Sequence, residues 1–563
     1  MRPVLFVYSM KVIDSKIIDS GYDKFEKLRI LEWNLAYAAV RGLSENSSRE
    51  QIFDYSLGKR MDRATVLGAA LAIKEYIQAN FGDEERIGIA LPSCIPGILV
   101  NLAVQMAGKV SVNLNFTLGP ESAAACLRKA GIRTVIGSNK VKEKVLQHYS
   151  DYPWGDRFID VGDMLKRIGK KRIVPKVIAV KLLPWRMTAA IFGIPKYGGN
   201  KEASIIFTSG SEGEPKAAVL THRNIIANCV QMSQIGIVWP GDATLHANLP
   251  LFHSFGQSIQ VWFCSIFGVR QVAVQSPLEV QSNLDAIREG GSTLMISTPT
   301  FLRSYYKKAT PADLGKLQYV IGGAEKTPDG FIEAWEGKFP SVRYLAGYGL
   351  TEASPVVAVN LPEGLKRGKM CPQPSSSKSE SVGEIFPGLQ AAVVSPETGE
   401  RLNIGETGIL QLRGASIFPG YLNMPEVNRE RIVDGWLNTG DLASLDSDGF
   451  IFIKGRLSRF SKIGGEMVPH TGIEEAVERA LNIENSDEPK IAVGSKIDPA
   501  KGEVLVLLAA MDIDMTALRK ALMKAGQPNL WIPRKMMRVE KIPLLATGKL
   551  DLGKIRKICM AAD

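Results

Sequence analysis

The chain has 563 residues, of which 45% are hydrophobic and 23% are charged, and its mean hydropathy is 0.00. This balance excludes a disordered or fibrous protein, and the length allows roughly two to four domains. The formal net charge is +11, and the 6 cysteines show no CxxC spacing. Scattered cysteines favour reduced thiols in a cytoplasmic protein and give no structural zinc site.

The N-terminal part predicts helices that alternate with short strands. Residues 1–10 lack the apolar core and the small-residue cleavage site of a secretion signal. A helical pattern at 64–80 is followed by an apolar run at 87–91. The longest uncharged window, 87–108, contains Pro92 and Pro96, so we expect a strand, a turn and a packed helix there instead of a membrane span.

Residues 164–201 carry most of the excess positive charge and contain no acidic residue. Aliphatic residues are interleaved with the basic ones, and Trp185 stands beside Arg186. This mixture suits the headgroup boundary of an anionic membrane, with the tryptophan as an interfacial anchor. The basic residues are Lys166, Arg167, Lys170, Lys171, Arg172, Lys176, Lys181, Arg186, Lys196 and Lys201.

Other interpretations of this basic segment stay open. An acidic protein partner would fit it equally well through electrostatic steering. A solvated connection whose apolar residues only cover the main domain is the structural alternative. Nucleic acid is disfavoured because the aliphatic content is high and no recognition motif is present.

An apolar strand at 203–207 leads directly into residues 208–216, Thr-Ser-Gly-Ser-Glu-Gly-Glu-Pro-Lys. Hydroxyls, bare backbone N–H groups and one lysine at the end of a strand suit the phosphates of a nucleotide. A Walker A loop is disfavoured, because Pro215 precedes Lys216 and 217–220 resembles a second strand. The helix is expected to begin after Thr221 as its N-cap. A mobile hairpin turn is the alternative.

Later segments predict an α/β fold with a separate C-terminal part. Apolar runs at 244–249, 271–274, 293–297 and 317–321 alternate with helical patterns, as in layered structure with largely parallel sheets. Short strands then suggest a β-rich subdomain at about 383–455, after a Lys/Pro/Ser-rich loop. We therefore expect an N-terminal domain at 1–455 and a small mobile α+β lid at 456–563.

Several further motifs follow the hydroxyl-rich turn: Gly322-Gly323-Ala324-Glu325, Tyr348-Gly349-Leu350-Thr351-Glu352, Thr439-Gly440-Asp441, Gly455-Arg456 and Gly548-Lys549. In this order and spacing they resemble the adenylate-forming superfamily of acyl-CoA synthetases, luciferases and peptide-synthetase adenylation domains. The resemblance runs from about residue 87 to the C-terminus. Strings at 205–213, 249–256 and 462–468 look most like the acyl-[acyl-carrier-protein] synthetase half of bacterial acylglycerophosphoethanolamine acyltransferase/synthetase proteins.

The resemblance implies a site for the phosphates of ATP and for Mg²⁺. Lys216 would lie near the phosphates, Thr351 would contact the α-phosphate, and Glu352 would help to hold the metal. Without the resemblance, Glu352 would equally be a surface charge. The residues that would hold the β- and γ-phosphates are Thr208, Ser209, Gly210, Ser211 and Gly213.

The nucleoside would be held by residues of the later motifs. Tyr348 would stack on adenine, Asp441 would accept hydrogen bonds from both ribose hydroxyls, and Arg456 would also reach the ribose. Taken alone, Tyr348 would equally be a packed core aromatic. The other cofactor-binding residues implied here are Gly323, Ala324, Glu325 and Gly349.

The acyl substrate and the thiol would meet residues of two further segments. His253 would line the carboxylate site, and Gly465 resembles the loop beside the pantetheine arm, where glycine lets a thin thiol pass. Lys549, on the lid, would reach the α-phosphate and the carboxylate during adenylation, so the lid must close and then rotate away. The hinge position of the family, commonly Asp or Lys, is Ser458 here.

The activity implied is ligation of a fatty acid to acyl carrier protein, with ATP and Mg²⁺ as cofactors. A carboxylate would attack ATP to form an acyl adenylate, and a thiol would then displace AMP. Lys216, Thr351, Glu352 and Lys549 would be the catalytic residues. Long-chain acyl-CoA synthetase is the close alternative, and an inactive nucleotide-binding adaptor at the membrane is the third. The expected location is cytoplasmic or peripheral on the inner membrane face.

Overall fold

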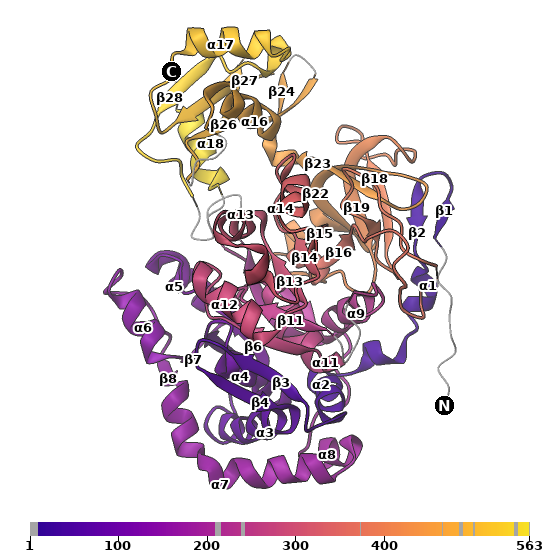
Figure 1. The fold of residues 1–563 in the computed structure, drawn as a ribbon, viewed down its shortest axis with the longest axis vertical. Coiled ribbons are helices and arrows are strands. Elements are labelled where there is room, and N and C mark those ends of the chain that lie inside the picture. The colour runs from indigo at the N-terminus through magenta and orange to yellow at the C-terminus, as the bar shows by residue number, and fades with distance from the viewer. Residues whose placement is uncertain are drawn as a thin grey trace.

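The computed structural model describes residues 10–208, 215–237, 243–371, 373–463, 466–483, 488–498, 502–544 and 550–561. They form a large N-terminal α/β domain and a smaller C-terminal domain, which stands at the top of Figure 1. The mixed α/β architecture with a small terminal domain confirms the predicted fold class.

The first sheet contains the strand that precedes the hydroxyl-rich turn. Its apolar strands are mostly parallel and lie between helices, so both faces are buried. The predicted strand at 217–220 pairs antiparallel with the strand before it, which confirms a second strand here instead of a Walker A helix. In spatial order the strands are β20 (Gly420–Tyr421), β10 (Lys216–Thr221), β9 (Glu202–Thr208), β6 (Val110–Asn113), β5 (Arg86–Ala90), β7 (Thr134–Gly137) and β8 (Arg157–Asp160).

The second sheet contains all the strands predicted between 244 and 321. They pair in parallel, which confirms that part of the prediction. In spatial order the strands are β17 (Glu384–Ile385), β16 (Val356–Val359), β15 (Arg343–Gly349), β14 (Tyr319–Gly322), β13 (Leu294–Ser297), β11 (Thr244–Ala247), β12 (Arg270–Ala273), β3 (Glu50–Asp54) and β4 (Lys59–Asp62).

The third sheet is the β-rich subdomain, and it includes an N-terminal hairpin that the sequence did not predict. The hairpin pairs through Ile17–Asp19 with the strand Gln390–Val394, which lies far away in the sequence. In spatial order the strands are β1 (Lys11–Ile13), β2 (Ile17–Asp19), β18 (Gln390–Val394), β19 (Thr407–Arg413), β22 (Trp436–Leu445) and β21 (Ile432–Val433), with β23 (Ile451–Arg456) beside β22.

The C-terminal domain has its own sheet and its own apolar clusters. Arg456 still belongs to β23 of the large domain, so we propose that the domain boundary follows this residue. The strands of the fourth sheet are β25 (Glu466–Pro469), β24 (Phe460–Ile463), β27 (Gly502–Ala509) and β26 (Ile491–Asp498), with β28 (Lys535–Arg538) beside β27.

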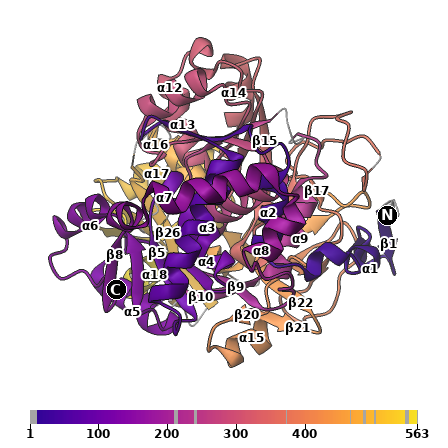
Figure 2. The same ribbon diagram turned by 90° about the horizontal axis from the view of Figure 1, so that it is seen from below.

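Helices cover both faces of the two large sheets, as Figures 1 and 2 show. The predicted helix at 64–80 is confirmed, and the uncharged window contains a strand followed by a packed helix. The helices are α1 (Tyr22–Phe25), α2 (Leu35–Ser44), α3 (Arg63–Asn80), α4 (Ile95–Met106), α5 (Pro120–Ala130), α6 (Asn139–Leu146), α7 (Val161–Leu182), α8 (Trp185–Ile191), α9 (His222–Met232), α10 (Ser254–Gly256), α11 (Cys264–Phe267), α12 (Val280–Gly290), α13 (Pro299–Lys308), α14 (Phe331–Lys338), α15 (Pro425–Arg431), α16 (His470–Leu481), α17 (Met515–Lys524) and α18 (Leu552–Met560).

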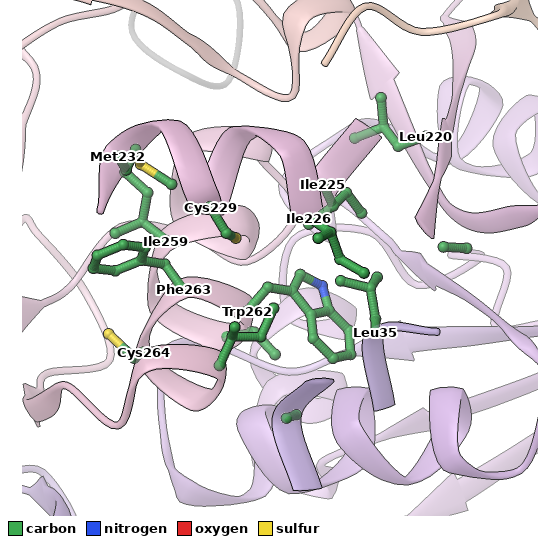
Figure 3. Packing of buried hydrophobic residues seen from close by; sticks show 14 of the residues in the cluster. Leu35, Leu220, Ile225, Ile226, Cys229, Met232, Ile259, Trp262, Phe263 and Cys264 are labelled. Carbon is green, nitrogen blue, oxygen red and sulfur yellow. The ribbon is translucent and has the colours of Figure 1, made fainter. Parts of the chain in front are cut away.

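The helix after the hydroxyl-rich hairpin is fixed at its start and along its apolar side. Thr221 caps α9 through a capping box with Asn224, which confirms the predicted N-cap. The apolar side of α9 packs against Trp262, which is fully buried in a π-helix at Gln257–Phe263 (Figure 3). This packing ties the segment after His253 to the hairpin, so two of the predicted site segments share one core.

The basic segment forms two helices along the lower edge of Figure 1, α7 and α8. Gly169, with a φ of 68°, interrupts α7, and the helix continues beyond it. Within the described ranges, none of the helices has the length and apolarity that a bilayer crossing requires.

Buried histidines should make the fold less stable in mild acid. Burial lowers the pKa of His222 from its ordinary value of 6.5 to about 4. Because the folded pKa is the lower one, the stabilisation is complete above pH ~6.5 and is lost as the pH falls toward 4. Between pH 7 and 4, this group lowers the free energy of unfolding by about 3 kcal/mol, and we expect His222→Gln to remove that contribution. Urea midpoints followed by tryptophan fluorescence between pH 7 and 4 measure it, and an unchanged slope would contradict the assignment.

Candidate active site

Asp441 lies at the centre of a hydrogen-bonded cluster formed by three of the predicted residues. Its carboxylate, in the middle of β22, is almost fully buried and faces residues at the ends of β15 and β23. The Tyr348 hydroxyl donates to Oδ2 at 2.6 Å, and Nε of Arg456 donates to Oδ1 at 2.8 Å. Asp441 and Arg456 are direct partners across the β22–β23 pair, so strand register alone brings them together.

Each oxygen of Asp441 therefore accepts one hydrogen bond from the protein. A carboxylate offers about four lone-pair directions, so each oxygen keeps room for a second donor. Burial and then the Asp441 carboxylate raise the pKa of Tyr348 well above its usual value, so the phenol stays a donor. Asp441 likewise raises the pKa of Arg456. The cluster is thus an anionic acceptor that can take two more donors, as two vicinal hydroxyls would require.

Glu352 lies beside Lys216 through an intervening tyrosine. The Tyr421 hydroxyl donates to Oε1 of Glu352 at 2.5 Å, and both residues are buried. Nζ of Lys216 lies 5.8 Å from the centroid of the Tyr421 ring. Tyr421 reaches this place because β20 pairs with β10 at Ala218. Tyr421 thereby contacts a carboxylate through its hydroxyl and an ammonium group through the face of its ring.

Thr208 and Lys216 are partners at the turn end of the β9–β10 hairpin. The Thr208 hydroxyl donates to the Lys216 carbonyl oxygen at 3.5 Å. The turn between them carries predicted phosphate ligands that lie outside the described residues: Ser209, Gly210, Ser211 and Gly213. Of the described residues here, Lys216 lies beside Tyr421, which in turn contacts Glu352.

The His253 segment meets the Tyr-Gly-Leu-Thr-Glu segment through hydroxyl groups. The Ser254 and Thr351 hydroxyls lie 3.1 Å apart, where one donates to the other. His253 precedes α10 and packs against Phe252, with ring centroids 4.9 Å apart. The predicted acyl-site and α-phosphate segments are therefore neighbours.

The structure gives different physical reasons for the glycines in the two Gly-containing motifs. A Cβ on Gly349 would overlap the Pro355 carbonyl, and one on Gly322 would overlap the Tyr344 hydroxyl. Packing alone therefore requires both glycines. A Cβ on Gly323 would make only ordinary contacts, with the Gly347 carbonyl oxygen at 3.4 Å and with Phe255 at 3.8 Å, so packing does not require this glycine. Gly323 is the position that fits a wall of a ligand pocket.

Ala324 and Glu325 close this part of the site in an unusual backbone conformation. Ala324 has a φ of 69°, a left-handed conformation that costs a non-glycine residue about 1 kcal/mol. The Glu325 carboxylate accepts hydrogen bonds from the backbone N–H and the hydroxyl of Thr300 at the start of α13. Glu325 therefore has a structural role at this helix start, and backbone strain accumulates at Ala324.

The two domains are joined by an ion pair next to this loop. Nζ of Lys326 lies 2.7 Å from Oε1 of Glu475 on α16. Burial opposes the charge of Lys326, but Glu475 raises its pKa overall. Ser458, the predicted hinge residue, lies in a short 3₁₀ turn between the last strand of the large domain and β24. The predicted residues Gly465 and Lys549 lie outside the described residues.

The metal-binding capacity of the site rests on one carboxylate. Among the described residues there is no group of three His, Cys, Asp or Glu side chains that could hold an ion. Mg²⁺ at phosphates is commonly bound by one or two carboxylates, and substrate phosphates and water complete the shell. Glu352 beside Lys216 fits that donor set.

Sequence reasoning missed Tyr421 and Ser254. Tyr421 stands outside the recognised motifs, and only the pairing of β20 with β10 shows that it reaches Glu352. Ser254 follows His253 directly, and its hydroxyl beside an apolar run was the one available signal.

Comparison with known families gives a direct match. The sequence model of a family described as AMP-binding enzyme matches residues 56–422. The matched range includes β9, β10 and the motifs that contain Gly323, Tyr348 and Glu352.

Individual relatives match over most of their length. 4-Coumarate–CoA ligase 2 of Oryza sativa subsp. japonica is 27% identical over 84% of this chain and 83% of its own. The long-chain-fatty-acid–CoA ligase of Salmonella typhimurium is 26% identical over 86% and 88%. The crystal structure of ATP-bound MatB from Rhodopseudomonas palustris has a TM-score of 0.72 and is 20% identical, covering 92% of this chain and 98% of that chain.

Proposed function

Because the chain belongs to the AMP-binding enzyme family, we propose that it activates a fatty acid with ATP and transfers the acyl group to acyl carrier protein. The observation that carries the adenylation step is the cluster around Asp441, which keeps one acceptor direction on each carboxylate oxygen. The name of the Salmonella relative supports a fatty acid as the acyl substrate.

The reaction has two steps, and both depend on charge placement. A carboxylate oxygen of the fatty acid attacks the α-phosphorus of ATP, and the bond to pyrophosphate breaks. The thiol sulfur then attacks the acyl carbonyl carbon, and AMP leaves. Asp441 would hold the ribose, while Lys216 and the Thr351 hydroxyl would offset charge on the phosphates. Mg²⁺ held by Glu352 would add neutralising charge on the phosphate oxygens.

One observation favours acyl carrier protein as the acceptor. The strings at 205–213, 249–256 and 462–468 resemble synthetases that use this carrier. The second candidate is a long-chain fatty acyl-CoA synthetase, favoured by the Salmonella relative. Both acceptors present the same phosphopantetheine thiol, so the first step is common to them.

Direct competition between the two thiols tests the proposal. The purified protein is given ATP, Mg²⁺ and a labelled fatty acid, with holo acyl carrier protein and CoA at equal concentration. We expect the label mainly on the carrier protein. Label found almost entirely on CoA would replace the proposal by the second candidate, and no thioester with either acceptor would contradict both.

Tyr421 should affect the Mg²⁺ concentration that the reaction requires, because its hydroxyl donates to Glu352. Tyr421→Phe removes a hydrogen bond to a buried carboxylate but keeps the aromatic ring beside Lys216. We expect fatty-acid-dependent pyrophosphate exchange to fall about tenfold at limiting Mg²⁺ and to recover partly at high Mg²⁺. Tyr152→Phe, which changes a buried hydroxyl that donates to Asn115, is the matched control. An identical Mg²⁺ dependence in both variants would rule out this role.

A further inference from the structure

Helix α7 packs one side against the large domain and exposes the other. Val180 is buried, and Val177 lies against α3 at Gly68, where a Cβ would approach the valine to 2.6 Å. Figure 2, seen from below, shows α7 running across α3. These contacts bury the apolar side chains on the inner side of α7. A second set of apolar side chains lies on the outer side of the helix.

The outer side of α7 and the helix that follows both carry exposed apolar side chains. Val174, Ile178 and Leu182 are spaced by four residues, so they share one side of α7. Leu182 is 77% exposed, and Ile191 on α8 is 61% exposed. We call this set, completed by Met187, the apolar ridge. Large aliphatic side chains gathered in this way usually mark a contact surface.

The basic side chains around the ridge divide into two groups. Lys176 forms an ion pair with Glu75, and Lys181 forms one with Asp62, so both attach α7 to the domain. Other basic residues beside the ridge are exposed, and no acidic residue occurs from 164 to 201. The exposed basic residues beside the ridge are Lys170, Lys171, Arg172 and Arg186.

Trp185, which the sequence predicts as an interfacial anchor, is half-buried. Its ring packs against Tyr37 and Trp33, with ring centroids 5.2 Å and 6.1 Å away. Arg186 lies over the same ring at 5.3 Å. The residues available to a partner are therefore aliphatic and basic, and the aromatic residue orients α8 against α2.

We propose that the apolar ridge and its basic flank dock on an anionic lipid surface. Aliphatic side chains would enter the headgroup boundary, while lysine and arginine would remain among the lipid phosphates. A lipid surface fits better than an acidic protein, because the ridge consists of aliphatic side chains and lies far from the candidate site. Figure 1 places α7 and α8 at the end of the molecule opposite the C-terminal domain.

This orientation has a consequence for the proposed function. The C-terminal domain would point away from the lipid, so its movement would not be blocked by the membrane. Docking itself needs neither ATP nor a thiol, so it does not depend on the enzymatic activity. Binding should weaken as the salt concentration rises, because salt screens the attraction between the basic residues and the lipid phosphates.

Sedimentation of the full-length protein with vesicles tests the proposal. Vesicles of phosphatidylcholine with phosphatidylglycerol are compared with phosphatidylcholine alone, without ATP or fatty acid. We expect binding only to the anionic vesicles. Ile178→Ser combined with Leu182→Ser and Ile191→Ser should weaken it about tenfold or more. These positions are exposed, so the variant should keep the melting temperature of the parent protein.

A second variant tests the charge. Lys170→Gln, Lys171→Gln and Arg172→Gln leave the ion pairs of Lys176 and Lys181 intact. We expect a loss of similar size and a weaker salt dependence. The matched control removes an equal charge from α17 on the C-terminal domain, through Arg519→Gln, Lys520→Gln and Lys524→Gln, and should bind like the parent.

Three outcomes would overturn the proposal. The first is the absence of binding to anionic vesicles by the parent protein. The second is equal binding by the parent, the apolar-ridge variant, the charge variant and the control. The third is retention of the parent on immobilised acyl carrier protein, lost in the charge variant, while vesicles are not bound, and this third pattern would assign the surface to the carrier protein.

Discussion

Asp441→Asn should lower kcat/KM for ATP in fatty-acid-dependent pyrophosphate exchange by about 10²–10³. The substitution keeps the size of the side chain but removes the charge and one acceptor oxygen. Two hydrogen bonds to a charged acceptor contribute about 1.5–3 kcal/mol each. Asp441 is buried, and its two protein donors orient both oxygens, so no other conformation readily replaces it.

The neighbouring tyrosine supplies the control for this effect. Tyr348→Phe removes one donor to Asp441 but leaves the carboxylate and Arg456 in place. Its loss in kcat/KM should stay near tenfold. The exchange assay is run with a thermal melt of each variant, because a general loss of folding would lower both activities together. Full activity of Asp441→Asn would exclude a ribose-binding role.

Lys549→Ala should abolish adenylation and spare thioester formation from supplied acyl adenylate. The expected loss in pyrophosphate exchange is about 10³ or more, because one cation would offset the repulsion between phosphate and carboxylate. The second step begins from a neutral acyl carbonyl beside the adenylate and does not need this charge. The two half-reactions are measured separately, with a synthetic acyl adenylate and holo acyl carrier protein for the second.

Lys541→Ala is the matched control, because this exposed lysine lies on the same domain. It should leave both half-reactions unchanged. Equal loss of both half-reactions in Lys549→Ala would contradict a lid that alternates between two orientations. The ion pair of Lys326 with Glu475 shows one contact that such a movement would have to break or remake.

Local patterns predicted much of the fold because their causes are local. The apolar runs at 244–249 and 293–297 became β11 and β13, and Thr221 capped α9 as its side chain and the following polar residue require. The proline and the apolar residues around Lys216 correctly predicted a second strand in place of a helix. Each of these results depends on neighbours within a few residues.

Features that depend on distant pairing could not be predicted in the same way. The strand at Ile17–Asp19 joins β18, and Tyr421 reaches Glu352 through β20, although neither segment carries a local signal for its partner. The motif that contains Asp441 identified the residue, but its hydrogen bond to Tyr348 depends on how two sheets meet. Likewise, composition showed that α7 is basic and apolar, but only packing on α3 separates its inner side from its outer side.

Fatty-acid-dependent exchange of labelled pyrophosphate into ATP, without any thiol, is the most direct test of the central claim. The account predicts exchange that requires a fatty acid and Mg²⁺ and is lost in Asp441→Asn. A protein that binds ATP but shows no exchange with saturated fatty acids of any chain length would contradict it, and would indicate a nucleotide-binding adaptor instead.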